Sequence, residues 1–286
     1  MVRIFGILAG LFFAFAVLWS FVVGAITVAP VVSEYGKFVE PTVEHEFYKH
    51  PKELSLASNG VFGNFDKQQL QRGFQVYKEV CSACHSLRLV AFRDLSQLGY
   101  NEAEVKAIAK GFQVPGVDPN TGEVNTRPGL ATDYFPKPFA NDIAARAANN
   151  NAVPPDLSLM TKARHDGPAY VYSLLTGYQS QPAKLLKEFP DSKTPTGLHY
   201  NPYFPNLNLA MAPPLTGNGQ VTFGDGTKST VPQMAKDVAA FLVWTAEPKL
   251  AKRNQTGWPV LLFLIVFTGL AYLAYQNVWR DKKGTH

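Results

Sequence analysis

The sequence predicts a mostly α-helical domain that a C-terminal helix fixes to a membrane. Three observations indicate this fold class: each end of the 286-residue chain carries a long apolar segment, the middle has apolar residues at helical spacing, and 16 of the 21 prolines fall within residues 115–232. A mean hydropathy of −0.07 excludes a multi-span membrane protein. The 13% of aromatic residues excludes a disordered polyelectrolyte.

The first apolar segment lies at the N-terminus. No charged residue occurs from Ile4 to Ser33, and residues 4–29 are almost wholly apolar. At 1.5 Å per residue, this run is long enough to cross a bilayer. We expect residues 1–29 to be a hydrophobic export segment, either a retained anchor or a signal cleaved near Val23-Gly24-Ala25.

The second apolar segment lies near the C-terminus, where no charge occurs from Asn254 to Trp279. Aromatic residues of the kind found at membrane interfaces include Trp258 and Tyr275, and the basic run Arg280-Asp281-Lys282-Lys283 follows. A buried hydrophobic helix is the alternative interpretation. We expect a transmembrane anchor over residues 258–279 and, by the positive-inside rule, a cytoplasmic tail over residues 280–286.

The region between the two apolar segments, residues 30–257, is expected to form one periplasmic domain at the inner membrane. The formal charge of the chain is +5, but several bases lie at its ends, so this middle region is close to +2. No cluster of lysine and arginine alternates with aromatic residues there, as it would along a phosphate backbone. Nucleic acid is therefore excluded as a partner.

The first helix of the domain is predicted to begin after Asp66. Asp66 can cap the helix with Gln69 as its capping-box partner, and Phe65 can pack on Leu70. Apolar residues then recur on one helical face. They are Leu70, Phe74, Tyr77, Cys81 and Cys84.

Two more helices are predicted, over Glu102–Lys110 and from about Thr230 to Glu247. The proline-rich stretch between them is expected to be a long irregular segment in which an apolar cofactor supplies part of the core. A weak hairpin signal occurs at Val221–Gly226, and little other sheet is expected.

The chain's two cysteines lie in the run Cys81-Ser82-Ala83-Cys84-His85, the C-x-x-C-H pattern of c-type haem attachment. On a helical turn these three side chains face one way, so two thiols can bond the haem vinyl groups while the imidazole binds the iron. A structural zinc site would need a further pair of ligands, and a thioredoxin-like pair would follow a strand. The sequence therefore predicts one covalently bound haem c.

The second axial ligand is left open by the pattern alone. Candidate histidines include His165 and His199, which we expect to be surface or hydrogen-bonded structural residues. Met234 lies on the apolar face of a predicted helix, where core packing is favoured, and Met160 has no distinguishing context. Met211 lies in an extended proline-rich turn that can present its thioether to a flat ring.

Several segments resemble the cytochrome c1 family of bacterial type, the haem subunits of cytochrome bc1 complexes. The resemblance covers roughly residues 60–280. It is carried by the segments at residues 72–77, 81–86, 145–150, 154–158, 174–178, 200–205, 211–214, 235–238 and 246–248. It implies a c-type cytochrome domain with a long irregular insertion, plus the C-terminal transmembrane helix.

The resemblance also implies roles for individual residues. It makes His85 and Met211 the axial ligands, Cys81 and Cys84 the thioether positions, and Arg146 the partner of a haem propionate. It places three aromatic side chains around the haem, namely Tyr200, Tyr203 and Phe204. Without the resemblance, Arg146 would be read as a solvated arginine, and the three aromatic residues as core packing.

The implied function is electron transfer within a membrane complex that also contains cytochrome b and a Rieske iron–sulfur protein, with a cytochrome c as acceptor. Unlike some family members, this chain has Gln179 after Tyr178 and no thiol for a disulfide in the insertion. The rival interpretations are a membrane-anchored c-type carrier or oxidase subunit, a haem enzyme or gas sensor with a vacant sixth position, and a structural scaffold. Residues 30–66 carry a local charge of −3, which makes an acidic docking rim for a basic cytochrome c another expectation.

Overall fold

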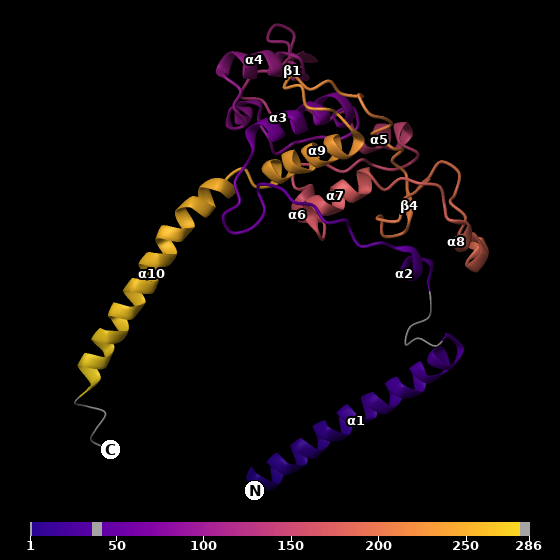
Figure 1. Cartoon of the computed structure of the whole chain (residues 1–286), viewed down its shortest axis with the longest axis vertical. Helices are drawn as coiled ribbons and strands as arrows, with labels where there is room; N and C mark the ends of the chain where they lie inside the picture. The colour runs from indigo at the N-terminus through magenta and orange to yellow at the C-terminus, as the bar shows by residue number, and fades with distance from the viewer. Residues whose placement is uncertain (1, 36–41, 281–286) are drawn as a thin grey trace.

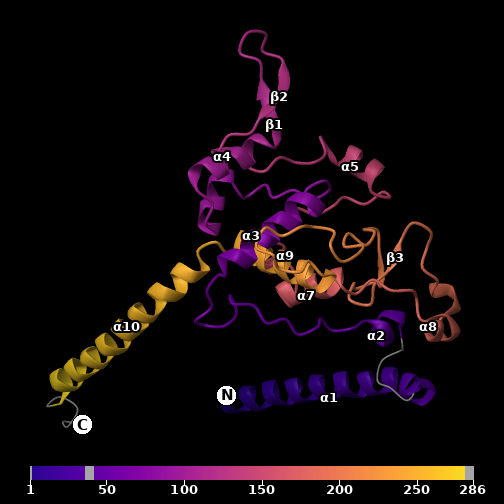
Figure 2. The same cartoon turned by 45° about the horizontal axis from the view of Figure 1, so that its top comes forward.

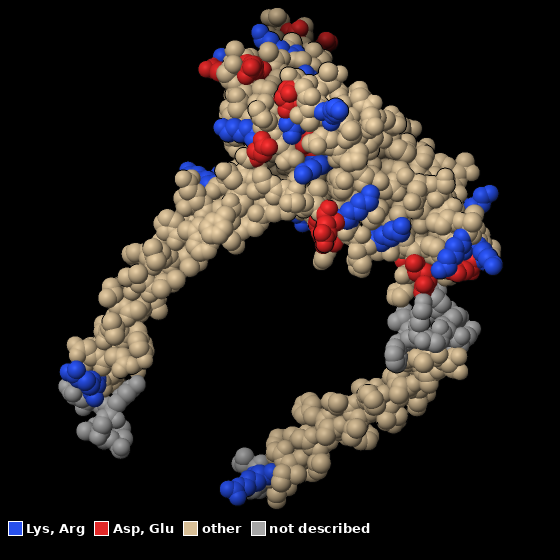
Figure 3. Space-filling view, viewed as in Figure 1, with Lys and Arg blue, Asp and Glu red and all other residues tan. Residues whose placement is uncertain are grey.

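The computed structural model describes residues 2–35 and 42–280. Two long helices, α1 (Val2–Tyr35) and α10 (Leu250–Trp279), extend from the same side of a helical domain (Figure 1). Both are long and apolar enough to cross a membrane, and Figure 3 shows charged side chains only near their ends. α10 anchors the chain in the membrane. Of the tail expected at residues 280–286, residues 281–286 lie outside the described part of the chain.

The core of the domain is built on a crossing of α3 (Lys67–Val76) and α9 (Val231–Ala246), with α6 (Met160–Ala163) and α7 (Gly167–Leu175) packed alongside. α3 begins as predicted, because the Asp66 carboxylate accepts hydrogen bonds from the Gln68 and Gln69 amides. The Gln69 side chain does not complete a capping box, since its amide donates to Asp237 of α9 instead (3.0 Å).

The other two predicted helices are confirmed. α4 (Glu102–Lys110) has a reciprocal capping box between Asn101 and Glu104. In α9, the Thr230 side chain accepts from the Gln233 amide, and the helix ends before Glu247. Met234 of α9 is fully buried, as expected for a core residue. Mostly helical architecture is therefore confirmed for the domain.

The chain between α4 and α9 is mainly irregular, with short helices α5 (Asp142–Ala148) and α8 (Ala183–Glu188), and α2 (Val43–Phe47) lies before the core. β1 (Gln113–Val117) and β2 (Val124–Pro128) form an antiparallel hairpin that projects from the domain (Figure 2). A second, two-residue pairing joins β3 (His199–Tyr200) and β4 (Asn208–Leu209). Two short 3₁₀ helices, Phe92–Leu98 and Pro190–Ser192, also form in the described part of the domain.

The hairpin predicted at Val221–Gly226 is wrong. Val221 and Phe223 are buried with Thr222 exposed between them, as in a strand, but the segment pairs with no second strand among the described residues and has only a turn, in which the Gly226 amide donates to the Phe223 carbonyl (3.4 Å). The Thr222 carbonyl accepts a hydrogen bond from Gln75 of α3, which ties this segment to the helix. The hairpin turn forms instead after Asp118, whose side chain accepts from the Asn120 and Thr121 amides.

Gly73 sets the close approach of α3 to α9. A Cβ atom added at this position would lie 2.1 Å from the Asp237 carbonyl oxygen and 2.7 Å from the Phe241 Cβ. Neither atom can move without shifting α9, because the first is backbone and the second is attached directly to it. A residue larger than glycine at position 73 would therefore force the two helices apart.

Gly73→Ala is expected to lower the free energy of unfolding by about 1–3 kcal/mol, since overpacking outweighs the gain in helix propensity. Gly224→Ala is the matched control, because nothing lies within 4 Å of its added Cβ, and it should be nearly neutral. Thermal unfolding followed by circular dichroism compares the two variants. Equal unfolding temperatures would show that the helix crossing tolerates the extra methyl group.

Candidate haem site

The cysteine motif lies at the C-terminal end of the first core helix. After α3 the backbone widens into a π-helical turn, Tyr77–Cys81, in which the Ser82 amide donates to the Tyr77 carbonyl (2.8 Å). The amides of Cys84 and His85 then both donate to the Cys81 carbonyl, at 3.1 and 2.9 Å. The apolar face predicted for this helix is buried as far as Tyr77. The cysteine motif lies in a separate helical turn, because the π-helical turn rotates the residues after it relative to α3.

Both cysteines are free thiols and half-buried. Burial raises the pKa of the Cys81 thiol to about 12, and the neighbouring Cys84 adds to the shift. The two cysteine side chains and His85 therefore share one short turn, in which burial keeps the Cys81 thiol protonated at neutral pH. Among the described residues, no group of three or more His, Cys, Asp and Glu side chains is arranged to hold a metal ion.

The His85 ring is oriented by a backbone carbonyl. Its Nδ1 atom lies 2.8 Å from the Pro155 oxygen, and a carbonyl can only accept, so Nδ1 carries the proton. Nε2 is then the unprotonated nitrogen with a lone pair available to a metal. Burial lowers the pKa of His85, with opposing contributions from Pro155 and Asp156, and this favours the neutral ring.

Asp156 holds the segment that supplies this carbonyl. Its carboxylate accepts from the Ser86 hydroxyl (2.7 Å), the Arg88 amide (2.8 Å) and the Ser158 amide (3.0 Å). Burial alone would raise the pKa of Asp156, but these hydrogen bonds keep it below its ordinary value. Pro155 and Asp156 are not among the site residues predicted from the sequence. The Asp-x-Ser turn after two prolines was the available signal.

Met211 is the described methionine that lies outside the core. Met160 and Met234 belong to the main hydrophobic cluster, with 9% and 0% of their surface exposed, whereas Met211 is half-buried. The Tyr178 hydroxyl, just past the end of α7, donates to the Met211 carbonyl (3.0 Å). Residues 155–178 therefore form one segment that begins with the hydrogen-bond partner of His85 and ends with that of Met211.

The three predicted aromatic residues occupy different environments. Tyr203 is buried against Gly177, where an added Cβ would lie 2.3 Å from the Tyr203 ring. Tyr200 packs in a smaller cluster with Leu185 and Leu207, and Phe204 is half-buried.

Arg146 is exposed on α5, and its Nη1 donates to the Asn151 carbonyl (2.9 Å). This bond holds a turn in which Asn150 and Asn151 both have positive φ. The expected surface position of His165 is confirmed, since its side chain is 98% exposed and lies 3.1 Å from the Asp166 carboxylate.

The donor set fits a c-type haem. It combines two thiols, a neutral imidazole with a directed lone pair, and an accessible thioether on a proline-rich turn. The sequence also matches the Cytochrome C1 family over residues 56–282. The chain belongs to the cytochrome c1 family.

Individual relatives agree with the family match. The chain is 46% identical over 233 residues to cytochrome c1 of Rhodospirillum rubrum, covering 78% of this chain and 85% of the relative. It is 46% identical over 237 residues to the cytochrome b/c1 protein of Bradyrhizobium diazoefficiens, covering 78% of this chain but 34% of that longer relative. A mitochondrial cytochrome b-c1 complex catalytic subunit of Candida albicans is 40% identical over 250 residues, covering 86% and 84%.

Membership of the cytochrome c1 family confirms the resemblance and the fold class inferred from the sequence. The chain is a haem protein that takes part in electron transfer.

Proposed function

We propose that this chain binds one haem c through Cys81 and Cys84, with His85 and Met211 as axial ligands, and transfers single electrons from a Rieske iron–sulfur protein to a cytochrome c. As a member of the cytochrome c1 family, the chain is a subunit of a cytochrome b-c1 complex, the ubiquinol–cytochrome c reductase. The observation that carries the ligand assignment is the hydrogen bond from His85 Nδ1 to Pro155, which leaves Nε2 for the iron.

The protein's own residues bind and orient the cofactor, which supplies a reversible one-electron couple when bound. His85 is fixed in tautomer and direction by Pro155, and Pro155 by the Asp156 network. Met211, a soft and weakly basic ligand, favours the reduced iron and so raises the potential. Two filled axial positions leave no site for oxygen or peroxide, which favours electron transfer over haem-enzyme chemistry or gas sensing.

The proposed partners are cytochrome b and a Rieske protein in the membrane, a cytochrome c as acceptor, and membrane lipid around the anchor. The haem domain, residues 30–257, lies on the periplasmic side in this proposal, with the basic C-terminus in the cytoplasm. Residues 1–29 serve export as signal or anchor. Copurification with cytochrome b and a Rieske protein separates this proposal from an oxidase subunit or a free anchored carrier, which would purify without them.

Covalent attachment is the first expected result. After denaturation, extraction with acidified organic solvent should leave the haem on the wild-type chain, because thioether bonds survive unfolding. Cys81→Ala and Cys84→Ala should each keep one bond and shift the α band of the pyridine haemochrome. Release of haem from the wild-type chain into the solvent would contradict the assignment of both thiols.

Docking of the acceptor gives a second expectation. Glu44 and Glu46 lie exposed on α2, while Figure 3 shows basic side chains close to acidic ones in this part of the molecule. Lys184 of neighbouring α8 lies 5.9 Å from the Phe47 ring. Of the other charges that motivated the acidic rim, Lys37 and Glu40 lie outside the described residues.

Reversing Glu44 and Glu46 to lysine should slow electron transfer to a basic cytochrome c and flatten its dependence on ionic strength, because exposed charges act within a Debye length of about 8 Å at physiological salt. The control reverses Glu102 and Glu123 to lysine. Both are exposed acids, Glu102 at the start of α4 and Glu123 just before β2, and their reversal should leave the dependence of the rate on ionic strength unchanged. The rate is measured across a salt series. An unchanged slope for the α2 variant would assign docking to another surface.

A further inference from the structure

A compact loop, residues 57–64, presents two apolar side chains to the exterior. The loop is closed by hydrogen bonds from the Asn64 amide to Ala57 (2.9 Å) and from the Gly63 amide to Gly60 (3.1 Å). At its tip, Val61 and Phe62 are 65% and 77% exposed. Phe62 stacks on Trp258 of α10, which is itself 44% exposed, so these side chains form one apolar surface with the membrane helix, as interaction sites do.

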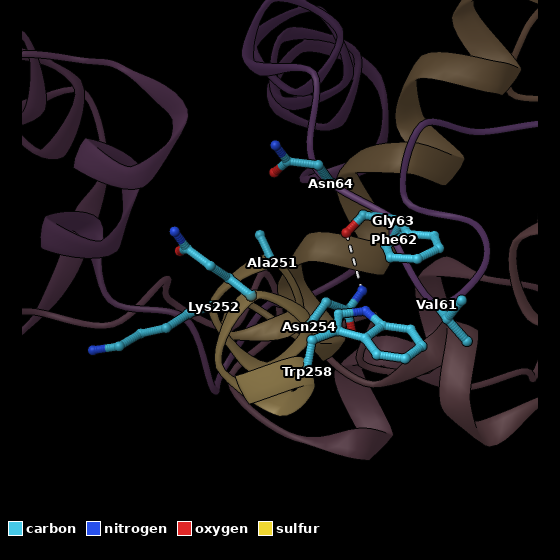
Figure 4. A pocket seen from close by; sticks show the side chains of 9 residues that line it. Val61, Phe62, Gly63, Asn64, Ala251, Lys252, Asn254 and Trp258 are labelled. Carbon is cyan, nitrogen blue, oxygen red and sulfur yellow. Dashed lines mark hydrogen bonds between the residues drawn. The ribbon is translucent and has the colours of Figure 1, made fainter. Parts of the chain in front are cut away.

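The loop is fixed to the start of the membrane helix. The Asn254 side chain of α10 donates to the Gly63 carbonyl (3.0 Å), and the Phe62 ring stacks on Trp258 with centroids 5.0 Å apart and planes at 16° (Figure 4). Gly63 permits this packing, because an added Cβ would lie 2.1 Å from the Ser58 carbonyl oxygen. The loop and helix therefore form one structural unit.

The position of Trp258 along α10 indicates the depth of this unit. From Trp258 to Trp279 the helix is about 33 Å long at 1.5 Å per residue, close to the roughly 30 Å hydrocarbon core of a bilayer. Tryptophans at both ends of such a span lie at the two interfaces. Lys252 and Arg253 lie one to two turns before Trp258, at the level of lipid phosphates. Phe62, stacked on Trp258, is placed at the same level.

A pocket of about 580 Å³ lies between the loop and α10, and its lining is partly apolar and partly polar. Val61, Phe62 and Trp258 supply apolar walls (Figure 4). Lys252 and Gln255 supply polar ones. Apolar and cationic groups at one site match the boundary between acyl chains and anionic headgroups.

We propose that loop 57–64 inserts Val61 and Phe62 into the interfacial layer of the bilayer beside α10. The loop then adds an attachment to the membrane surface beside α10. This attachment restricts rotation and tilt of the haem domain about α10, which keeps its electron-transfer face in a defined orientation. The inference concerns the anchor region and is independent of the haem ligands.

The test uses spin labels on the complete complex, reconstituted into vesicles of phosphatidylcholine and phosphatidylglycerol. Val61→Cys and Phe62→Cys are labelled separately, and Val61→Cys keeps the Phe62–Trp258 stack in case the other variant folds poorly. Val124→Cys is the matched control, an 84% exposed valine on the projecting hairpin. Wild-type complex carried through the same labelling gives the background.

The measurement compares collisions of each label with dissolved oxygen, which concentrates in lipid, and with a water-soluble nickel chelate. The proposal predicts an oxygen-to-nickel ratio several-fold higher at positions 61 and 62 than at position 124. A ratio equal to that of the control would place the loop in water and overturn the proposal. Exclusion of both reagents would also overturn it, and would show that another protein subunit covers the loop.

Discussion

Met211→Leu is expected to lower the reduction potential of the haem and open its iron to external ligands. Leucine keeps the approximate volume of methionine but has no sulfur, so the proposed soft axial bond is lost while both thioethers remain. Axial ligands set haem potentials over a range of roughly 0.8 V, so a fall on the order of 100 mV or more is expected. A lower reduction potential of the haem would slow electron transfer from the Rieske protein to it.

Redox titration measures the fall, and the ferric charge-transfer band of methionine-ligated haem should disappear with it. Met234→Leu is the matched control, because Met234 is fully buried in α9 and its replacement should leave band and potential intact. Carbon monoxide should bind rapidly to the reduced Met211→Leu protein only. Survival of the band in Met211→Leu would exclude Met211 as the ligand and direct the search to Met160.

Arg72→Met is expected to cause the largest loss of stability. Arg72 Nε donates to the Asp237 carboxylate (2.8 Å), and Asp237 is fully buried in α9 with the Gln69 and Gln233 amides as further partners. Removing the cation leaves a buried carboxylate without its counter-charge, at a cost of about 3–5 kcal/mol. The same guanidinium also bonds Asp225 (2.6 Å), so the loop before α9 should loosen.

Arg127→Met is the control for this effect. Arg127 makes a bidentate contact with Asp133, but both side chains are partly exposed, 41% and 21%, so solvent screens the pair and the loss of stability should be much smaller than for Arg72→Met. Chemical denaturation followed by circular dichroism gives both values. Equal losses for the two variants would show that burial of the Asp237 pair adds no stability beyond that of a surface pair.

The sequence-based prediction was most successful where a single pattern determined the outcome. Asp66 and Thr230 accept from the amides that their positions indicate, and Met234 and Phe74 are buried on the faces that helical periodicity assigns. The apolar end segments likewise form long exposed helices. Local capping and periodicity were sufficient here because no distant residue competes for the same groups.

Features that depend on distant contacts were not predictable in the same way. Gln69 leaves its cap because Asp237, 168 positions away in sequence, offers a buried acceptor. The Val221–Gly226 hairpin does not form, because the Thr222 carbonyl accepts its hydrogen bond from the Gln75 side chain of α3 and not from a second strand. The hydrogen-bond partner of His85 is a proline carbonyl 70 positions away. Every residue has a backbone carbonyl, so the sequence does not show which one accepts this bond.

The proposed route of the electron is tested by following the haem absorbance of the purified complex after rapid mixing with a quinol. We expect the haem to be reduced only when the Rieske protein is present, and added cytochrome c to reoxidise it. The control is the same complex stripped of its Rieske protein. Equally fast reduction in that preparation, or no reoxidation by cytochrome c, would contradict a role for this chain as the carrier between the two.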